Sequence, residues 1–296
     1  VKEAAIWSAV WVGIGLTFNI GLQVYADRHY NHGHGPLFEI EPLTLQFLTA
    51  YVLEYALSVD NIFVFILVFT YFGIPPEYRH RVLFYGILGA IIFRGVFIAL
   101  GTALLQIHWI VYVFGIFLIA TGIRSFIQIG GDDKDPSGNW VIRLMTRFVP
   151  VSSQLDGDKF FTVQNGIRVA TPLFVALVVL ETSDIVFAID SVPAVLGVSN
   201  EPFIVFTSNI LAILGLRSMY FLLAAVIERF HLLQIGLSVV LTFIGVKMVI
   251  LDNIWKAAYD VDRFPIGYSL LVIVGSLLTS VVASLIFKKK EEINPA

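Results

Sequence analysis

Two stretches of the sequence place pairs of carboxylates inside apolar surroundings. Residues 53–65 read LEYALSVDNIFVF, and residues 183–195 read SDIVFAIDSVPAV. Each stretch holds two carboxylates six residues apart, Glu54 with Asp60 in the first and Asp184 with Asp190 in the second. A carboxylate at the centre of a bilayer costs about 2.5–3.5 kcal/mol on insertion scales, so such residues usually face a polar cavity and mark a pathway.

The side chains available for chemistry in and beside these stretches are oxygen donors. The expected metal-binding residues are Glu54, Asp60, Asn61, Glu181, Asp184 and Asp190, with Ser58, Ser183, Ser191 and Asn209 nearby. Carboxylate, amide and carbonyl oxygens suit Mg²⁺, Ca²⁺ or Mn²⁺, and they do not suit Cu⁺ or a tetrahedral Zn²⁺ site. We therefore expect a site for a hard divalent cation with Asp60 and Asp190 as its central ligands. Glu54, Glu181 and Asp184 are expected as further ligands or proton carriers.

These residues also have structural interpretations. Arg94 and Arg217 lie within apolar runs, and a buried arginine in a membrane normally pairs with a carboxylate. Some of the acidic residues, Glu181 and Asp184 above all, are then ion-pair partners and not ligands. Asn209 is equally a ligand or an interhelical hydrogen-bonding residue. Three histidines in the loop of residues 27–41 are interpreted as part of a solvated loop and not as a metal site.

The composition indicates a membrane protein. Of the 296 residues, 57% are hydrophobic and only 14% are charged, with a mean hydropathy of +0.84. A soluble domain carries about 25% charged residues. The chain has no cysteine, which excludes disulfides and thiolate metal sites within it. It starts at Val1 without a cleavable signal pattern, which favours a trimmed version of a longer protein.

The apolar runs are long enough to cross a hydrocarbon core about 30 Å thick. They cover residues 4–25, 42–73, 82–102, 106–124, 168–199, 201–227, 232–251 and 268–287. As one helix, residues 42–73 would be about 48 Å long, and Glu54 and Asp60 would point about 120° apart. We therefore expect two half-helices that meet near Ser58, and a second interruption at Pro193, as in many transporters.

The positions of Lys and Arg predict that both termini are cytoplasmic. Asp60 aligns with Asp190, and further along Arg94 aligns with Arg217. We interpret this as an inverted repeat, although apolar sequences can also align by chance. The expected fold class is all-α, a polytopic membrane protein with an inverted repeat of 3+3 transmembrane helices, broken helices at the midplane and flanking helices. Its expected units are residues 1–41 (a span and an outer loop), 42–127 (the first repeat), 128–166 (a cytoplasmic linker with an amphipathic helix and an Asn-Gly hairpin), 167–251 (the second repeat) and 252–296 (a span and a basic tail).

Four stretches resemble the TerC family of integral membrane proteins, especially its Alx-like bacterial members. They are EYALSVDNIFVF, RHRVLFYGILGA, ETSDIVFAIDSVPA and PFIVFTSNILAILGLRSMYFLLAAVIERF, and the resemblance covers nearly all of the chain. It implies a protein of the bacterial inner membrane that exports divalent metal, chiefly Mn²⁺, as a substrate and not as a permanently bound cofactor. The acidic motif residues of the family carry over to the six expected ligands. Alx-like members usually have one more membrane helix before the position where this chain starts.

Three functions are compatible with these features to different degrees. The favoured one is a non-enzymatic divalent metal exporter that works by alternating access, with protons as the expected counter-ion and no nucleic-acid partner. No P-loop is present, which argues against direct use of ATP. The alternative is a non-transporting membrane scaffold or partner protein of a stress response of the tellurium-resistance type. An intramembrane aspartyl protease is disfavoured, since it needs Gly-x-Gly before its aspartate and this chain has LSV and FAI.

Overall fold

The computed structural model describes residues 2–30, 43–127, 150–152, 154–164, 166–224, 230, 232–260 and 264–287. The described helices are α1 (Lys2–Tyr30), α2 (Leu43–Tyr71), α3 (Pro76–Leu105), α4 (Ile110–Ile127), α6 (Pro172–Val198), α7 (Pro202–Leu223), α8 (Leu233–Val246), α9 (Asp252–Tyr259) and α10 (Ile266–Ile286). A π-helical turn, η3 (Lys247–Leu251), joins α8 to α9. Within this part of the chain, eight helical runs are long and apolar enough to cross a membrane. A polytopic all-α membrane protein is therefore confirmed.

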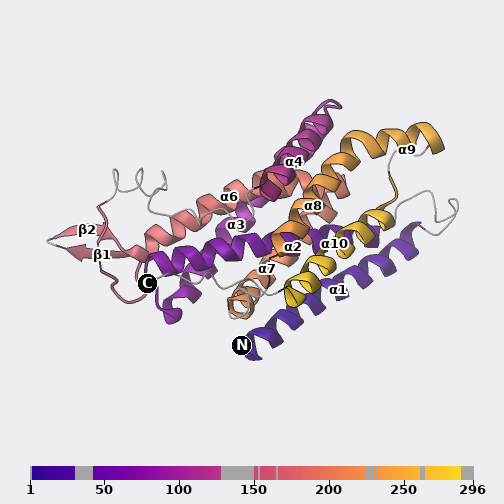
Figure 1. Ribbon diagram of the computed structural model, residues 1–296. Helices are drawn as coiled ribbons and strands as arrows, with labels where there is room; N and C mark the ends of the chain where they lie inside the picture. The colour runs from indigo at the N-terminus through magenta and orange to yellow at the C-terminus, as the bar shows by residue number, and fades with distance from the viewer. Residues whose placement is uncertain are drawn as a thin grey trace.

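The predicted amphipathic helix, most of the histidine-containing loop and the basic tail lie outside the described residues. The predicted hairpin is confirmed. Strands β1 (Phe161–Gln164) and β2 (Ile167–Ala170) pair antiparallel, and Gly166 in the connection has a φ of +77°, which glycine adopts readily. Figure 1 shows this hairpin at one end of the helical bundle and α9 at the other.

Proline residues mark where three of the membrane helices begin. Helices α3, α6 and α7 each have a proline in the first turn. Proline is tolerated there because the backbone N–H groups of the first turn have no partner within the helix, and its fixed φ already suits a helix. The apolar residues that follow build the spans without interruption.

The predicted helix breaks are wrong. Helix α2 is one continuous α-helix of 29 residues, and α6 is one of 27 residues that contains Pro193. An opening near Ser58 would serve to bring Glu54 and Asp60 together, but the partner of Glu54 comes from a neighbouring helix. Pro193 removes one backbone donor, and it lies near the C-terminal end of α6 in a wholly buried segment that packing holds in place.

Helices α2 and α6 cross in opposite directions. Ser199 donates a hydrogen bond to Gln46 at 2.6 Å, while Asn61 donates one to Asp184 at 3.0 Å. An early residue of α2 thus meets the end of α6, and a later residue of α2 meets the middle of α6. Around this crossing α2 packs on α7, α3 on α6, and α4 on α8. If α2, α3 and α4 are exchanged with α6, α7 and α8 in that order, each of these helix pairs maps onto another of them or onto itself. The packing thus fits two related units, and the inverted repeat itself stays a prediction.

Two apolar layers lie along these helices. The inner layer, on the cytoplasmic side of the predicted topology, contains Val59, Ile62, Phe65, Val68 and Phe69 of α2, Val82 and Leu83 of α3, Leu173, Ala176, Val179 and Leu180 of α6, and Leu216, Met219 and Tyr220 of α7. The outer layer contains Ala50, Leu53, Ala56 and Leu57 of α2, Ile98 of α3, Ala188, Val192, Ala194 and Val195 of α6, and Val205 of α7. On α3, α6 and α7 the two layers leave a gap, and this gap holds Arg94, Asp184 and Asn209.

Helix α4 approaches α8 closely through glycines. A Cβ atom added at Gly122 would lie 2.3 Å from Thr242 Oγ1 and 2.9 Å from the Ser238 carbonyl oxygen. A Cβ atom added at Gly245 would lie 2.5 Å from the Gly115 carbonyl oxygen. Membrane helices associate largely through such close packing, because lipid provides no hydrophobic driving force between them.

We therefore expect Gly122→Ala to destabilise the folded protein, with an overpacking cost of about 1–3 kcal/mol. The control is Gly13→Ala on α1, where nothing lies within 4 Å of the added Cβ atom. The measurement is the fraction that stays monodisperse after heating in detergent. Equal thermal resistance of the two variants would contradict close packing of α4 on α8.

Candidate functional site

The guanidinium of Arg94 is buried in the middle of α3. Only 2% of this residue is exposed. Its Nη1 atom forms an ion pair with Glu54 Oε1 of α2, and its Nη2 atom lies 3.2 Å from Asp184 Oδ1 of α6. Nη1 also donates to Asn209 Oδ1 of α7 at 3.3 Å. One cation thus connects α3 to three other candidate membrane-spanning helices.

Two amides complete this cluster. Asn61 Nδ2 donates to Asp184 Oδ1, the same oxygen that faces Arg94. Asn209 Nδ2 donates to the Val205 carbonyl oxygen at 2.9 Å, which fixes its own amide and turns its oxygen toward the guanidinium. Asn209 is therefore an interhelical hydrogen-bonding residue here, one of the two roles that the sequence left open.

Several oxygens of the cluster have no hydrogen-bond partner among the described residues. They are Glu54 Oε2, Asp184 Oδ2, Glu181 Oε2 and Ser58 Oγ. Glu54 is fully buried, and 6% of Asp184 is exposed. Leaving a buried polar group unpaired usually costs about 1–3 kcal/mol, and more when the group is charged. These oxygens are therefore the acceptors of the cluster that the described residues leave unused.

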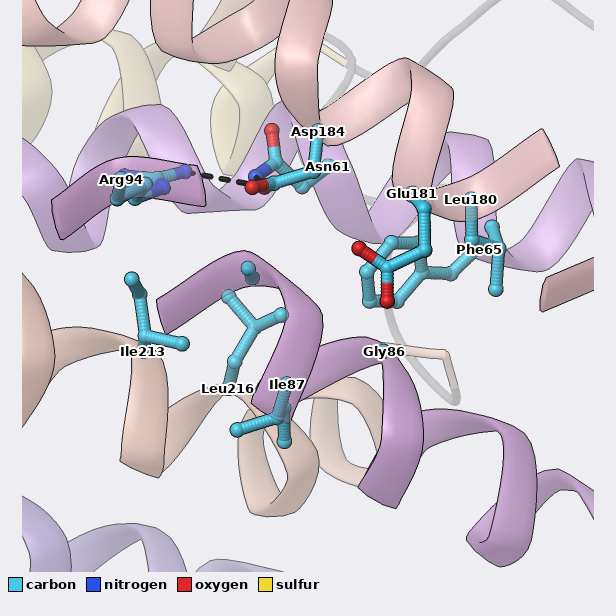
Figure 2. A pocket seen from close by; sticks show the side chains of 11 residues that line it. Asn61, Phe65, Gly86, Ile87, Arg94, Leu180, Glu181, Asp184, Ile213 and Leu216 are labelled. Carbon is cyan, nitrogen blue, oxygen red and sulfur yellow. Dashed lines mark hydrogen bonds and ion pairs between the residues drawn. The ribbon is translucent and has the colours of Figure 1, made fainter. Parts of the chain in front are cut away.

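A small cavity lies beside the ion pairs (Figure 2). Its volume is about 10 Å³ for the centre of a water-sized sphere, which is room for about one water molecule. Asn61, Arg94, Glu181 and Asp184 supply its polar lining, and apolar side chains of four helices supply the rest. Figure 2 shows the Glu181 carboxylate set apart from the Arg94–Asp184 pair.

Glu181 lies directly against the backbone of α3. A Cβ atom at Gly89 would lie 2.2 Å from Glu181 Oε1, so the carboxylate occupies space that any other residue at this position would fill. Sequence reasoning missed Gly89. The signal that could have found it is the run of small residues at Gly86, Gly89 and Ala90 on the span that carries Arg94.

Helical spacing explains which acidic residues meet. Glu54, Ser58 and Asn61 follow one another at intervals of four and three residues, and so share one face of α2. Glu181 and Asp184 are three residues apart and share a face of α6. The structure thus brings together four of the six expected ligands: Glu54, Asn61, Glu181 and Asp184.

The other two expected ligands lie elsewhere on the same helices. Asp60 is half-buried, lies about 120° around α2 from Glu54 and does not line the cavity. Asp190 is also half-buried, and its Oδ1 atom accepts a hydrogen bond from Thr121 of α4 at 3.4 Å. The Asp60 and Asp190 side chains are therefore outside the cluster, and their role as ligands stays a prediction.

Arg217 differs from Arg94, with which the sequence aligned it. It is exposed, and its Nη2 atom lies 2.9 Å from His80 Nδ1 of α3. The expectation of a second deep arginine paired with a membrane carboxylate is therefore wrong. The reason is rotation, because Leu216 and Met219 occupy the buried face of α7, and Arg217 lies about 100° around the helix from Leu216, outside that face.

The cluster can act chemically as an oxygen-rich site with its own cation. Across the described part of the chain, no three acidic or imidazole side chains already surround a single point. The Glu54 and Asp184 carboxylates point instead at Arg94. A bound cation would have to compete with the guanidinium for these carboxylates. Carboxylate and amide oxygens remain the donor set for a hard divalent ion.

Comparison with known proteins places this architecture among integral membrane proteins. The family model described as "Integral membrane protein TerC family" matches residues 41–292. "Uncharacterized membrane protein STKORF319" of Myxococcus xanthus is 48% identical over 286 residues, which cover 96% of this chain and 83% of the relative. "Putative membrane-bound redox modulator Alx" of Escherichia coli (strain K12) is 42% identical over 284 residues, which cover 95% of this chain and 84% of the relative. No solved structure matches the chain.

The ion pair with Arg94 involves Glu54 and not Asp60, so replacing these two acidic residues of α2 should change stability to different extents. We expect Glu54→Gln to destabilise the fold by about 1.5–3 kcal/mol, the range for a hydrogen bond to a charged group. Asp60→Asn removes no described ion pair and is expected to leave stability nearly unchanged. The measurement is thermal unfolding of both purified variants in one detergent. If Asp60→Asn proves the less stable of the two, the assignment of Glu54 as the structural partner of Arg94 is wrong.

Proposed function

This chain belongs to the integral membrane protein TerC family, and from that premise we propose that it exports a hard divalent cation, chiefly Mn²⁺, across a bacterial inner membrane. The cation is a substrate that passes through the protein. Its path includes the cluster around Arg94, and no enzymatic step is involved. The metal chemistry comes from the family resemblance and from the donor atoms, which agree.

One observation carries this proposal. Glu54 Oε2 and Asp184 Oδ2, buried carboxylate oxygens with no hydrogen-bond partner among the described residues, are held at the crossing of four membrane helices. Ionisable residues at such a depth are rare, and they usually mark an ion or proton pathway. A purely structural ion pair would be expected to satisfy both oxygens of each carboxylate, because an unpaired buried charge is costly.

The residues have distinct proposed roles. Glu181 borders the cavity and has no ion-pair partner in the part of the chain that the structure describes, so we assign it the first contact with an arriving cation. Asp184 and Asn61 then supply carboxylate and amide oxygens, and Glu54 completes the oxygen set. Asp60, and Asp190 on the pseudo-equivalent helix, remain proposed ligands at further positions along the path.

The two apolar layers are proposed to act as the gates of transport. The inner and outer layers pack on the two sides of the cluster, so an ion at the cluster is separated from both aqueous phases. Alternating access then requires one layer to open while the other stays closed, as secondary transporters with paired repeats do. Rigid-body movement of α2–α4 against α6–α8 would accomplish this.

Export is proposed to be driven by exchange with protons. No P-loop is present in the chain, and several membrane carboxylates can carry protons when no metal is bound. Transport into proteoliposomes should therefore accelerate when a pH gradient is imposed at clamped membrane potential. Equal rates with and without that gradient would exclude the coupling and leave the metal substrate untouched.

The name of the Escherichia coli relative favours a second candidate function. That name calls the relative a membrane-bound redox modulator. This chain contains no cysteine, so thiol chemistry by its own side chains is excluded. A redox effect of this chain would therefore arise indirectly, through the metal it moves or through a partner protein in a stress response.

The export proposal is tested by intracellular manganese in Mn²⁺-challenged cells that lack their own exporters. We expect the wild type to lower the metal content, and Glu181→Gln and Asp184→Asn to lose this effect by about tenfold or more. Even outer-shell changes alter metal affinity or activity about 10–100-fold. Glu201→Gln, which changes an exposed carboxylate between α6 and α7, is the control at matched membrane levels.

In the same assay, Asp60→Asn and Asp190→Asn test whether the path extends beyond the cluster. We expect both to reduce export. Unchanged export in all four cluster and path variants, with the wild type active, would place the pathway elsewhere. An inactive wild type would favour the scaffold or partner function.

Gly89→Ala tests the position of Glu181 without changing any polar group. The added Cβ atom must displace the Glu181 carboxylate from the α3 backbone, and we expect export to fall although helix propensity improves. Gly86→Ala is the matched control, since its Cβ atom meets only Leu177 at 4.0 Å. Equal export by the two variants would mean that the position of Glu181 is unimportant.

A further inference from the structure

We propose that Arg94 is a fixed internal cation that sets the charge of the ion this site accepts. The inference rests on the proposed function, since it concerns the same cluster, and it deepens it by assigning a residue that determines specificity. A guanidinium keeps its charge under all physiological conditions. It therefore always neutralises one of the negative charges of the site.

The contacts of Arg94 show that it occupies only one oxygen of each carboxylate. Its nitrogens reach Glu54 Oε1 and Asp184 Oδ1, and the second oxygens, Glu54 Oε2 and Asp184 Oδ2, stay without hydrogen-bond partners in the described part of the chain. Arginine can bind one carboxylate through two parallel hydrogen bonds. Here its two terminal nitrogens are spread over residues on three helices, which leaves one oxygen of each of the two carboxylates without a described partner.

The charges of the protein side chains then give the site a defined net charge. Metal ligands are deprotonated when they bind, so Glu54, Glu181 and Asp184 contribute three negative charges. Arg94 contributes one positive charge. Glu54 belongs to this count through its ion pair with Arg94 and does not itself line the cavity, whose charged lining among the described residues is Arg94, Glu181 and Asp184. The remainder is two negative charges, which a divalent cation neutralises and a monovalent or trivalent cation does not. In a membrane interior that match matters, because an unbalanced charge is poorly solvated.

This assignment differs from a purely structural role in what it predicts. If Arg94 only holds the helices together, replacing it lowers stability and leaves the preference among bound ions unchanged. If Arg94 sets the charge, Arg94→Gln leaves three negative charges and shifts the preference toward trivalent ions. Removing one carboxylate together with Arg94 restores two negative charges and should restore the divalent preference.

The experiment measures ion binding to the full purified chain in a neutral detergent. Free Mn²⁺ is quantified by electron paramagnetic resonance, and La³⁺ is titrated as a competitor to obtain the ratio of La³⁺ to Mn²⁺ affinity. The proteins are the wild type, Arg94→Gln, the double variant Glu54→Gln/Arg94→Gln and Arg217→Gln. The last removes an exposed arginine of α7 and serves as the matched control. Glu181→Gln/Asp184→Asn provides the background from other carboxylates.

We expect Arg94→Gln to raise the La³⁺ to Mn²⁺ ratio by about tenfold or more, as one unit charge within the cluster would do at an intermediate dielectric. The double variant should return to within about threefold of the wild-type ratio, and Arg217→Gln should not differ from the wild type. If Arg94→Gln does not fold, a folded double variant whose ratio stays within about threefold of the wild-type ratio supports the proposal. A double variant whose ratio lies about tenfold or more above the wild-type ratio overturns it.

A wild-type ratio in Arg94→Gln would overturn the role of Arg94 while the metal site itself stands. The exporter proposal fails separately if the wild type binds no more Mn²⁺ than the background variant does. In that case the inference about Arg94 falls with it. Selectivity is thus read from the ratio of La³⁺ to Mn²⁺ affinity, and binding is read from the amount of bound Mn²⁺, in the same titration.

Discussion

A guanidinium buried in a membrane is the constraint on which the rest of this structure depends. Arg94 can remain charged there only if carboxylates and amides surround it, and a single helix cannot supply them. Glu54, Asp184 and Asn209 therefore arrive from three other helices. Their convergence fixes the rotation of α2, α6 and α7 about α3, and the apolar layers on both sides follow from that rotation.

Close approach of the helices is the second condition for the cluster. The Glu181 carboxylate lies against the α3 backbone because Gly89 has no side chain, and α4 meets α8 through Gly122. In lipid, such contacts provide attraction that hydrophobic burial provides in water. Gly89 therefore serves the polar site, since it lets the Glu181 carboxylate approach α3, and Gly122 serves the packing of α4 on α8.

The acidic residues were identifiable from the sequence, but their grouping was not. Residue type and apolar context marked Glu54 and Asp184, and spacing showed that Glu54 and Asp60 cannot face the same way on a straight helix. The prediction resolved this conflict by breaking the helix. The structure resolves it by keeping α2 continuous and giving Glu54 a partner on α3, so Asp60 faces elsewhere.

The sequence by itself determined the membrane class, the positions of the spans, the Asn-Gly hairpin and the oxygen character of the site. These follow from composition, run length, local turn chemistry and residue type, all of which are local properties. Only the tertiary structure decided that Arg94 is buried while Arg217 is exposed, and that Glu181 rather than Asp60 borders the cavity. Periodicity specifies which residues share a face of one helix. It does not specify which neighbour that face meets, because that depends on packing among segments far apart in the chain.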